Sequence, residues 1–319
     1  MRLRSAFTYA LLSALSLTML AQLLRDRTAA LALIMFVPVL PIALITFVWD
    51  VVLRGRALPI RWLLTAVGIG CGAIALSWQW QPARAPEPGS SDSQLRIVQW
   101  NTQWGGANRE TFEHVLDGLE AQQPDIACLS EAPFTYILKA AWAKRHPGWY
   151  VEAAADSSNE AYTYNLALIS RYPVHKQAEW PLSSGHAALF QVELPTRTLR
   201  TLLVDLQSSP RAPRSPSIRE VVQLIEARAK ADAPIDIVLG DFNTPGRFLG
   251  FDALAAAGGG FQLAALWSGH WRGTWPAWMR MPFYDIDHIW VSKRWSIQNS
   301  QLFIGYSDHR GQRVDLRPR

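Results

Sequence analysis

The hydrophobic and polar positions divide the chain into two regions of different character. Up to about residue 80, apolar residues run together in three stretches of about 19–21 residues, 6–24, 29–49 and 60–78, with almost no charge. This is the length that an α-helix needs to cross about 30 Å of hydrocarbon. From residue 95 onward the apolar runs shorten and alternate with polar residues. The pattern predicts three transmembrane helices followed by a globular domain.

The first stretch admits a second interpretation, because Arg2 and Arg4 precede an apolar run as they do in a cleaved signal peptide. Its apolar run exceeds the roughly 7–15 residues usual for a signal peptide, and no convincing small-residue cleavage site precedes Gln22. We therefore favour a retained helix.

A segment rich in Pro, Ser and charge, 81–94, separates the two regions. Its composition cannot form a core, so it is predicted to be a semi-extended linker that lifts the following domain off the bilayer. The expected organisation is a membrane region over 1–80, the linker, and a catalytic domain over 95–319.

Strand-length apolar runs alternate with amphipathic helices in this domain. Strands are predicted at 95–100, 125–129, 150–154, 166–169, 187–194, 198–206, 235–239, 286–292 and 302–304. Helices are predicted over 109–122 and from Ser217 to residue 229. The strands at 166–169, 187–194 and 198–206 are expected to be neighbours in a meander. This order predicts an α+β fold in which two packed sheets are covered by helices.

The charge is concentrated in the membrane region. Residues 1–94 carry eight Arg, no Lys and four acidic residues, whereas 95–319 carries 23 basic and 22 acidic residues. Arg is held on the cytoplasmic side of a membrane, and its distribution over the short flanks predicts a multi-pass protein of the cell (inner) membrane whose catalytic domain is extracytoplasmic. The nearly neutral domain shows no obvious basic face for a nucleic acid.

Polar residues gather where the predicted strands end. They are Asn101, Glu131, Asp241, Asn243, Asp287, Asp308 and His309. Carboxylate and amide oxygens with few imidazoles suit Mg²⁺ or Mn²⁺ rather than zinc, and a cation held in this way usually acts on phosphate. In-line attack on phosphorus needs an activated water, charge neutralisation and support for the leaving oxygen, which a carboxylate, a divalent ion and a His can supply.

The ordered series Trp100-Asn101, Ser130-Glu131, Gly240-Asp241-Phe242-Asn243, Ile286-Asp287-His288 and Ser307-Asp308-His309 resembles the endonuclease/exonuclease/phosphatase superfamily. That superfamily includes DNase I, abasic-site endonucleases, sphingomyelinases and inositol polyphosphate 5-phosphatases. The resemblance spans essentially all of 95–319. It implies a DNase I-like, four-layer α/β/β/α sandwich, here preceded by three transmembrane helices.

The resemblance also implies a divalent-metal site. Glu131 is expected to be the principal ligand of Mg²⁺ or Mn²⁺. Asn101 would lie beside it and hold the metal shell or a phosphate oxygen, and Asp308 would complete the metal side.

The remaining strand-end residues are expected to act on the reaction itself. Asp241 would orient or deprotonate the attacking water, and Asn243 would donate a hydrogen bond to the phosphoryl oxygens. His309 would contact the phosphate, and Asp287 would hold the other ring nitrogen of that imidazole.

One position departs from the family pattern. Where members commonly carry a His before the second helix, this chain has Asp205 and Gln207. A carboxylate at that position repels phosphate unless it is protonated or metal-bound. Either the substrate sits differently or Gln207 donates instead.

A Trp-rich segment precedes Asp287 and includes Trp275 and Trp278. Packing of a loop and core is one explanation, because Trp fills irregular space. The other is a substrate-binding rim that holds an apolar moiety or reaches the headgroup layer, where Trp is enriched.

These observations favour a membrane-anchored, metal-dependent phosphatase or phosphodiesterase whose substrate is a phosphorylated lipid or a small phosphoester, with the lipid bilayer as a partner. Some membrane-anchored bacterial members of the family have a similar layout and are linked to hydrolysis of lipid-carrier pyrophosphates and to glycopeptide resistance. A membrane-tethered nuclease and a non-catalytic binding module of the same fold are the alternatives. The presence of every expected active-site residue disfavours the binding module.

Overall fold

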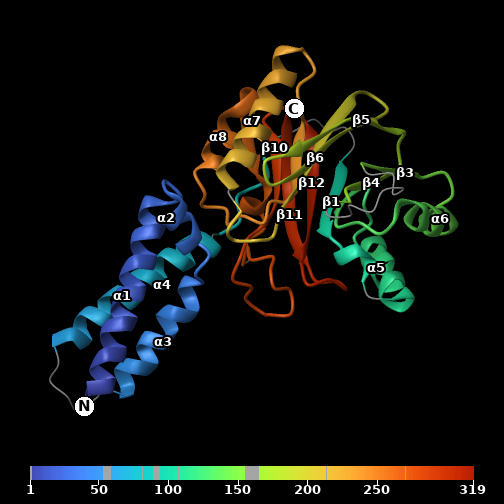
Figure 1. The fold of residues 1–319 in the computed structure, drawn as a ribbon. Helices are drawn as coiled ribbons and strands as arrows, with labels where there is room; N and C mark the ends of the chain where they lie inside the picture. Colours follow the sequence, from blue (N-terminus) through green and yellow to red (C-terminus); the bar gives the residue numbers. More distant parts are fainter. Residues whose placement is uncertain are drawn as a thin grey trace. The chain divides into compact units, whose positions relative to one another are not determined.

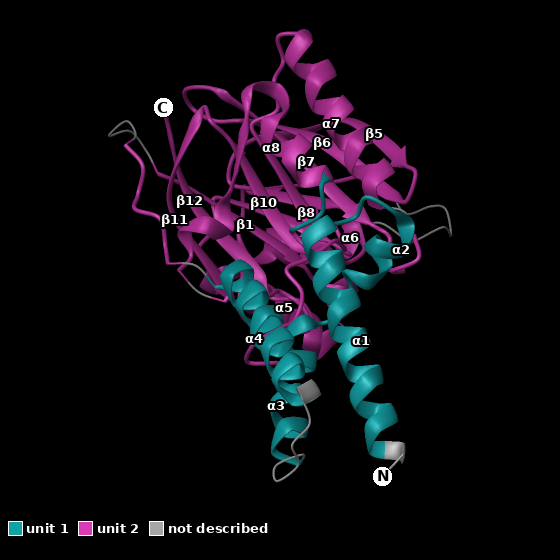
Figure 2. Cartoon of the chain, turned by 90° about the vertical axis from the view of Figure 1, so that its left-hand side faces the viewer, with its two compact units in different colours: residues 1–81, 247–249 teal, residues 82–246, 250–319 magenta. Residues whose placement is uncertain are grey.

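The computed structural model describes residues 2–52, 59–80, 82–88, 94–106, 108–154, 165–212, 214–269 and 271–319. It divides the chain into two compact units (Figure 2). The first comprises Met1–Gln81 with Arg247–Leu249, and the second comprises Pro82–Gly246 with Gly250–Arg319.

The first unit is helical. Its helices are α1 (Arg2–Leu24), α2 (Ala29–Ile34), α3 (Val39–Val52) and α4 (Pro59–Gln79). Leu15 of α1, Ala43 of α3 and Leu64 of α4 are buried together in one apolar cluster. A Cβ on Gly68 would lie 2.2 Å from Thr46 Oγ1, so α3 and α4 approach each other at a point where only glycine fits.

The prediction of one continuous helix over 29–49 is wrong. The segment forms α2 and α3, with a break between Ile34 and Val39. Pro38 explains the break, because proline lacks an N–H and its ring clashes with the carbonyl four residues earlier in a helix. Among the described residues, helices over 4–24 and 61–79 are long and apolar enough to cross a membrane, whereas 39–52 is a shorter apolar helix.

The first half of the predicted linker packs along the second unit. Arg84 N donates to Leu266 O at 3.0 Å, and Trp267 Nε1 donates to Ala85 O at 3.0 Å. Glu87 N also donates to Ile297 O at 3.2 Å. Residues 82–88 therefore belong to the second unit, while residues 81 and 89–93 lie outside the described part of the chain.

The second unit contains two six-stranded sheets (Figure 1). The first has the order β11 (Trp295–Phe303), β12 (Gly311–Pro318), β1 (Leu95–Asn101), β2 (Ile126–Ser130), β4 (Ala167–Ser170) and β3 (Tyr150–Ala153). The second has the order β5 (Val174–Leu182), β6 (Gly185–Glu193), β7 (Thr198–Leu206), β8 (Ile237–Asp241), β10 (Asp287–Ser292) and β9 (Phe261–Leu263).

Helices cover the outer face of each sheet. Figure 1 shows α5 (Arg109–Ala121) and α6 (Thr135–Arg145) beside the first sheet, and α7 (Arg214–Lys230) and α8 (Gly250–Ala256) beside the second. Short 3₁₀ turns complete the unit: η1 (Gln103–Gly105), η2 (Ala257–Gly259) and η3 (Ala264–Trp267). This arrangement confirms the predicted four-layer α/β/β/α sandwich.

Strand alternation decides which side chains enter the layer between the sheets. Ile97 of β1, Leu239 of β8 and Ile289 of β10 belong to the apolar cluster of that layer. Because side chains alternate between the two faces of a strand, the residues two or four positions from these on the same strands share their face. Asn101, Asp241 and Asp287 therefore point into the same inter-sheet layer as the core.

The expected meander is only partly correct. β6 and β7 are antiparallel neighbours, but β4 pairs with β2 and β3 in the other sheet. In the sequence, β5 lies between β4 and β6. It was not predicted because it is rich in polar residues and many of its side chains are exposed, so it contains no apolar run. Similarly, β12 has no continuous apolar run because polar and apolar residues alternate along it, although most of its residues are buried.

Candidate active site

The predicted site residues meet at one edge of the sandwich. β1 and β2 are parallel, and their pairing places Asn101 opposite Ser130, immediately before Glu131. In the other sheet, β10 runs antiparallel to β8, so that Asp287 at its start is opposite Asp241 at the end of β8. Strand direction therefore gathers residues that are far apart in the sequence.

Asp241 lies at the centre of this edge and is held by three hydrogen bonds, two accepted by its carboxylate and one donated by its backbone N–H. Asn101 Nδ2 donates to Asp241 Oδ2 at 2.9 Å, across the two sheets. Asn243 N donates to Asp241 Oδ1 at 2.8 Å, and Asp241 N in turn donates to Ser130 Oγ at 3.3 Å. The carboxylate is 1% exposed, so its orientation is fixed from both sheets.

The backbone conformation explains why Gly and Asn stand at positions 240 and 243 of Gly240-Asp241-Phe242-Asn243. Gly240 has a φ of 139°, and a Cβ there would lie 1.9 Å from Val204 O of the adjacent strand. Asn243 has a φ of 46°, a left-handed conformation that Asn tolerates better than most residues. The chain therefore turns sharply after β8 and leaves Asp241 and Asn243 at the edge.

His309 and Asp287 form a buried pair beside Asp241. His309 Nδ1 lies 2.8 Å from Asp287 Oδ2, and His309 Nε2 lies 3.8 Å from Asp241 Oδ2. Gln99 Nε2 donates to Asp287 Oδ1 at 3.3 Å. Asp287 therefore fixes the imidazole and directs its Nε2 toward Asp241, which is the contact that the family resemblance implies for Asp287.

Burial and mutual charge shift the pKa values of this group. Burial and the neighbouring Asp287 raise the pKa of Asp241 to about 7. Burial lowers the pKa of His309, but Asp287 and Asp241 outweigh that effect and raise it to about 10. His309 is therefore a cation near neutral pH, and Asp241 can gain or lose a proton in the same range.

Glu131 lies directly after β2 and is partly buried. It has a φ of 43°, and its carbonyl accepts hydrogen bonds from Thr102 Oγ1 at 2.9 Å and Trp104 N at 2.7 Å. Burial raises the pKa of the Glu131 carboxyl, although the nearby Asn101 amide and His309 oppose that rise. The turn thus brings this carboxylate toward the group formed by Asn101, Asp241 and His309.

Asp308 is also partly exposed at this edge. Trp275 Nε1 donates to Asp308 Oδ2 at 3.1 Å, which orients the carboxylate. Trp275 is half-buried, whereas Trp278 is 79% exposed. The two indoles that the sequence grouped as substrate-binding therefore lie in different environments, one against Asp308 and the other in solvent.

The donor set fits a divalent cation. Among the described residues, His309 is the ion-pair partner of Asp241 and Asp287, and no Lys or Arg pairs with these carboxylates or with Glu131. Ligand atoms of Asp241, Asp287 and His309 lie within 4.8 Å of one another. His309 already bonds Asp287 and is cationic, so oxygen donors on the Glu131 side suit a hard ion better than this imidazole does.

Asp205 adds a further buried carboxyl. It is opposite Asp241 in the pairing of β7 with β8, is 2% exposed, and its Oδ2 has no hydrogen-bond partner among the described residues. Burial, followed by the charges of Asp241 and Glu131, raises its pKa well above the usual range. Gln207 follows β7 and is exposed at the edge, so only Asp205 enters the inter-sheet layer.

Asn243 is anchored by its own amide. Asn243 Nδ2 donates to Leu206 O at 2.7 Å, and the buried Arg214 donates from Nε to Asn243 O at 3.0 Å. An amide nitrogen carries two hydrogens, so one N–H remains for a second acceptor. The position is therefore rigid and still able to donate.

The sequence assigned no role to four supporting residues, although Ser130 and Ser307 belong to the family-like motifs. The four are Gln99, Ser130, Thr274 and Ser307. Ser307 Oγ donates to Asn101 O at 2.8 Å and accepts from His309 N at 3.1 Å, which links the end of β1 to the loop before the adjacent β12. Thr274 Oγ1 accepts from Asp287 N at 3.2 Å. A polar Gln inside an apolar strand signals Gln99, but a hydroxyl at the end of a strand or in a loop gives no comparable signal.

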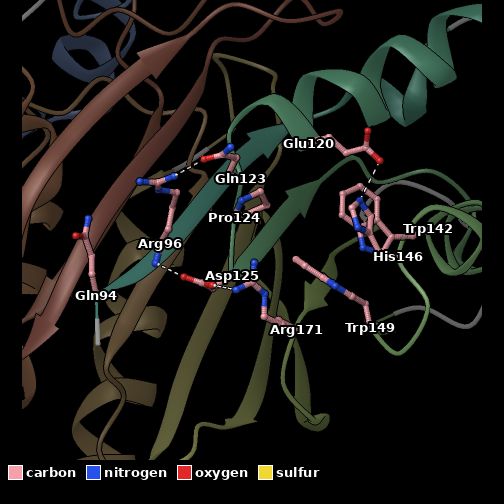
Figure 3. A pocket seen from close by; sticks show the side chains of 10 residues that line it. All are labelled: Gln94, Arg96, Glu120, Gln123, Pro124, Asp125, Trp142, His146, Trp149 and Arg171. Carbon is pink, nitrogen blue, oxygen red and sulfur yellow. Dashed lines mark hydrogen bonds and ion pairs between the residues drawn. The ribbon is translucent and has the colours of Figure 1, made fainter. Parts of the chain in front are cut away.

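A separate pocket of about 580 Å³ lies at the opposite edge of the first sheet (Figure 3). Arg96 and Asp125, at the beginnings of β1 and β2, line it together with Trp149 and Arg171. Arg171 forms an ion pair with Asp125 at 3.1 Å and stacks over Trp149, with 5.4 Å from its guanidinium carbon to the ring centroid. The pocket is therefore distinct from the cluster of strand-end acids.

A family model described as the Endonuclease/Exonuclease/phosphatase family matches residues 98–309 of the chain. This span includes every predicted site residue. Among curated proteins, no sequence matches significantly.

Solved structures share the fold of the second unit at low sequence identity. The human Nocturnin catalytic domain is 19% identical with a TM-score of 0.55, and the match covers 71% of this chain and 95% of that one. A mannosyl-6-phosphatase from Bacteroides thetaiotaomicron is 15% identical with a TM-score of 0.55, covering 70% and 99%. D. rerio TDP2 complexed with single strand DNA product is 16% identical with a TM-score of 0.51, covering 70% and 99%.

Proposed function

Because the chain belongs to the endonuclease/exonuclease/phosphatase family, whose members hydrolyse phosphoester bonds, we propose that it is a membrane-anchored, divalent-metal-dependent phosphatase or phosphodiesterase. The observation that carries this proposal is the buried contact of Asp241 with Asn101 on one side and with His309 on the other. It combines a proton acceptor, an amide and a cation at one edge, as hydrolysis of a phosphoester requires.

Asp241 is placed to activate water. Its Oδ2 accepts from Asn101 and its Oδ1 from Asn243 N, so the carboxylate is held rigidly while a pKa of about 7 lets it accept a proton. A base whose pKa lies near the working pH balances its ionised fraction against its basicity. Asp241 therefore takes the proton of the attacking water in this proposal.

His309 and Asn243 stabilise the negative charge that develops on the phosphoryl oxygens. His309 is kept cationic by Asp287, and its Nε2 lies 3.8 Å from Asp241 Oδ2. Asn243 Nδ2 donates one of its two hydrogens to Leu206 O, and in this proposal it donates the other to a phosphoryl oxygen. Rigid donors of this kind stabilise a transition state because they need no reorganisation when charge appears.

Glu131, Asn101 and Asp308 are the residues proposed to hold the metal, with Mg²⁺ as the first choice and Mn²⁺ as the second. When bound, such an ion would polarise a phosphoryl oxygen and neutralise its charge. The excess of buried carboxylates over cations at this edge supports the proposal, because those carboxylates repel one another without a counter-charge.

We propose a lipid-linked or small-molecule phosphate as the substrate. Two apolar helices of membrane-spanning length support anchoring in the cell (inner) membrane as a multi-pass protein. The distribution of Arg favours a cytoplasmic N-terminus, so an extracytoplasmic catalytic domain further requires that the segment of α2 and α3 crosses the membrane as well as α1 and α4. A solved neighbour bound to a DNA product keeps a nuclease as the second candidate.

The test is a substrate panel with purified, detergent-solubilised protein and Mg²⁺. The substrates are a polyprenyl pyrophosphate, phosphoinositides, bis-nitrophenyl phosphate and plasmid DNA, and Asp241→Asn serves as the blank. We expect hydrolysis of a lipid or small phosphoester by the wild type alone. Cleavage of DNA alone would assign the nuclease, and equal rates for wild type and blank on every substrate would refute an enzyme.

A further inference from the structure

Large apolar side chains are exposed on the loops that carry the active-site residues. Among the described residues of the second unit, eight large hydrophobic side chains are exposed, and seven of them lie on or beside these loops. We call these seven the apolar rim: Trp104, Phe134, Tyr136, Trp278, Met281, Ile304 and Tyr306. The eighth, Tyr150, begins β3 at the opposite edge, where it pairs with Ser170.

Each segment of the rim is joined to the active-site residues by a hydrogen bond or by the chain itself. Trp104 N donates to Glu131 O at 2.7 Å, and Phe134 follows Glu131 by three residues. Ala277 N, next to Trp278, donates to Asp308 O at 2.7 Å. Tyr306 precedes Ser307, which hydrogen-bonds Asn101 O. The rim therefore adjoins the active-site residues on the side of the first sheet and of the 268–286 loop.

The exposure is high for residues of this kind. Trp278 is 79% exposed, and Tyr136 and Ile304 are each 68% exposed. Soluble surfaces tolerate isolated apolar side chains, but their concentration at one functional edge marks an interaction site. Four of the seven are Trp or Tyr, the residues enriched at the boundary between water and acyl chains.

Charge distinguishes the rim from an ordinary surface. Among the described residues of the loops at 102–106, 131–134, 268–286 and 304–310, Arg280 is the exposed charged side chain, and it is a cation. Lys139 of α6, three residues after Tyr136, is also exposed and also a cation. Cations beside Trp, Tyr, Ile and Met suit contact with lipid headgroups. By contrast, the loop after β7 exposes Gln207, Ser208, Pro210 and Arg211, so the other side of the site is polar.

We propose that the apolar rim docks on the surface of a lipid bilayer and that the active site acts on a phosphate at the headgroup layer. The membrane-length helices in the same chain make a bilayer the partner available to this surface. The substrate is then an amphiphile, with its apolar part on the rim and its polar part toward Gln207 and Arg211. The substrate class rests on the proposed function, whereas the docking surface does not.

The docking is tested with a polarity-sensitive probe on the full chain. Cys71 and Cys128 are both buried, so a thiol-reactive dye labels a newly introduced surface cysteine selectively. Trp278→Cys and Ile304→Cys are labelled with a nitrobenzoxadiazole dye and reconstituted in lipid nanodiscs. Tyr150→Cys is the matched control, since it is an exposed aromatic at the opposite edge.

We expect blue-shifted emission and quenching by spin-labelled lipids for the probes at 278 and 304, and neither change at 150. Probes at 278 and 304 that behave like the control would overturn the proposal. Because this measurement needs no turnover, a lipid-buried rim on a protein without phosphoesterase activity would leave the docking intact and refute the proposed function.

The substrate class has its own test. Tyr136→Ser and Ile304→Ser are assayed in nanodiscs against a membrane-embedded lipid phosphate and against bis-nitrophenyl phosphate. We expect the ratio of the two activities to fall by about tenfold or more, because each variant loses an apolar side chain that contacts lipid. An unchanged ratio would show that the substrate does not approach over the rim.

Discussion

Asn101 donates a 2.9 Å hydrogen bond to Asp241, and this bond joins the two sheets of the sandwich at the active-site edge. Asn101 ends β1 of one sheet, and Asp241 ends β8 of the other. Both are almost fully buried, so neither side chain can reorient without disturbing the packing between the sheets. Stability of the sandwich and alignment of the active site therefore depend on the same contact.

Replacing Asp241 with Asn should abolish most of the activity while the fold persists. The amide is nearly isosteric but cannot accept a proton from water, and assistance of this kind is worth about 10²–10⁴-fold. Turnover of the substrate found in the panel measures the loss, and circular dichroism checks the fold. Activity within a few fold of wild type would show that Asp241 is not the base.

The same substitution should change how stability depends on pH in metal-free protein. Burial raises the pKa of folded Asp241 to about 7, whereas an unfolded Asp ionises near ~3.9. The folded chain thus keeps a proton between these values, and the associated stability is lost as the pH rises through about 7.

Thermal unfolding of wild type in a chelator should therefore show a Tm that falls more between pH 5 and 8 than the Tm of Asp241→Asn. The difference should amount to several degrees, since about 1 kcal/mol moves the Tm by roughly 2–4 °C in a domain of this size. Parallel curves for the two proteins would mean that Asp241 is ionised throughout.

Divalent metal should stabilise the protein through Glu131. Adding Mg²⁺ to chelator-treated wild type is expected to raise the Tm and restore activity, because an ion that binds the folded state alone shifts unfolding by mass action. Glu131→Gln should lose both effects. Glu152→Gln is the matched control, a partly buried Glu in the same sheet, and it should retain both. Equal metal responses in the two variants would exclude Glu131 as a ligand.

Asp287→Asn should act through His309. Without the carboxylate, the pKa of His309 should fall from about 10 toward its ordinary value, so the imidazolium is lost at lower pH. The high-pH limb of the rate profile should move to lower pH. A double variant with His309→Gln should be no slower than His309→Gln alone, because the two residues act as a unit. Additive losses would indicate independent roles.

Substitutions of Trp275 and Trp278 should differ in their effect on metal affinity. Trp275→Phe removes the donor to Asp308, and loss of a partner that orients a ligand costs about 10–100-fold in metal affinity. Trp278→Phe leaves that bond in place and should keep the metal affinity. Metal titrations followed by activity or Tm compare the two. Equal affinities would mean that Asp308 takes no part in binding the ion.

The sequence determined the fold class because the hydrophobic period itself carries that information. The strand at 95–100 and the helix at 109–122 were predicted nearly to their observed ends, β1 and α5. The prediction of one continuous helix over 29–49 was wrong because apolar character alone does not show that Pro38 interrupts the helical backbone. β5 and β12 were missed because neighbouring strands, rather than their own apolar content, hold them in the sheets.

The sequence by itself also determined the chemical types at the site, since a residue such as Asp241 or Asn243 after an apolar strand must lie at a sheet edge. Only the tertiary structure decided that Trp275 orients Asp308, that Asp205 faces Asp241, and that Ser307 links Asn101 to His309. These relations depend on strand direction and pairing between segments up to two hundred residues apart. Local sequence carries no record of such pairings, because a hydrogen bond across two sheets exists only when the whole sandwich has closed.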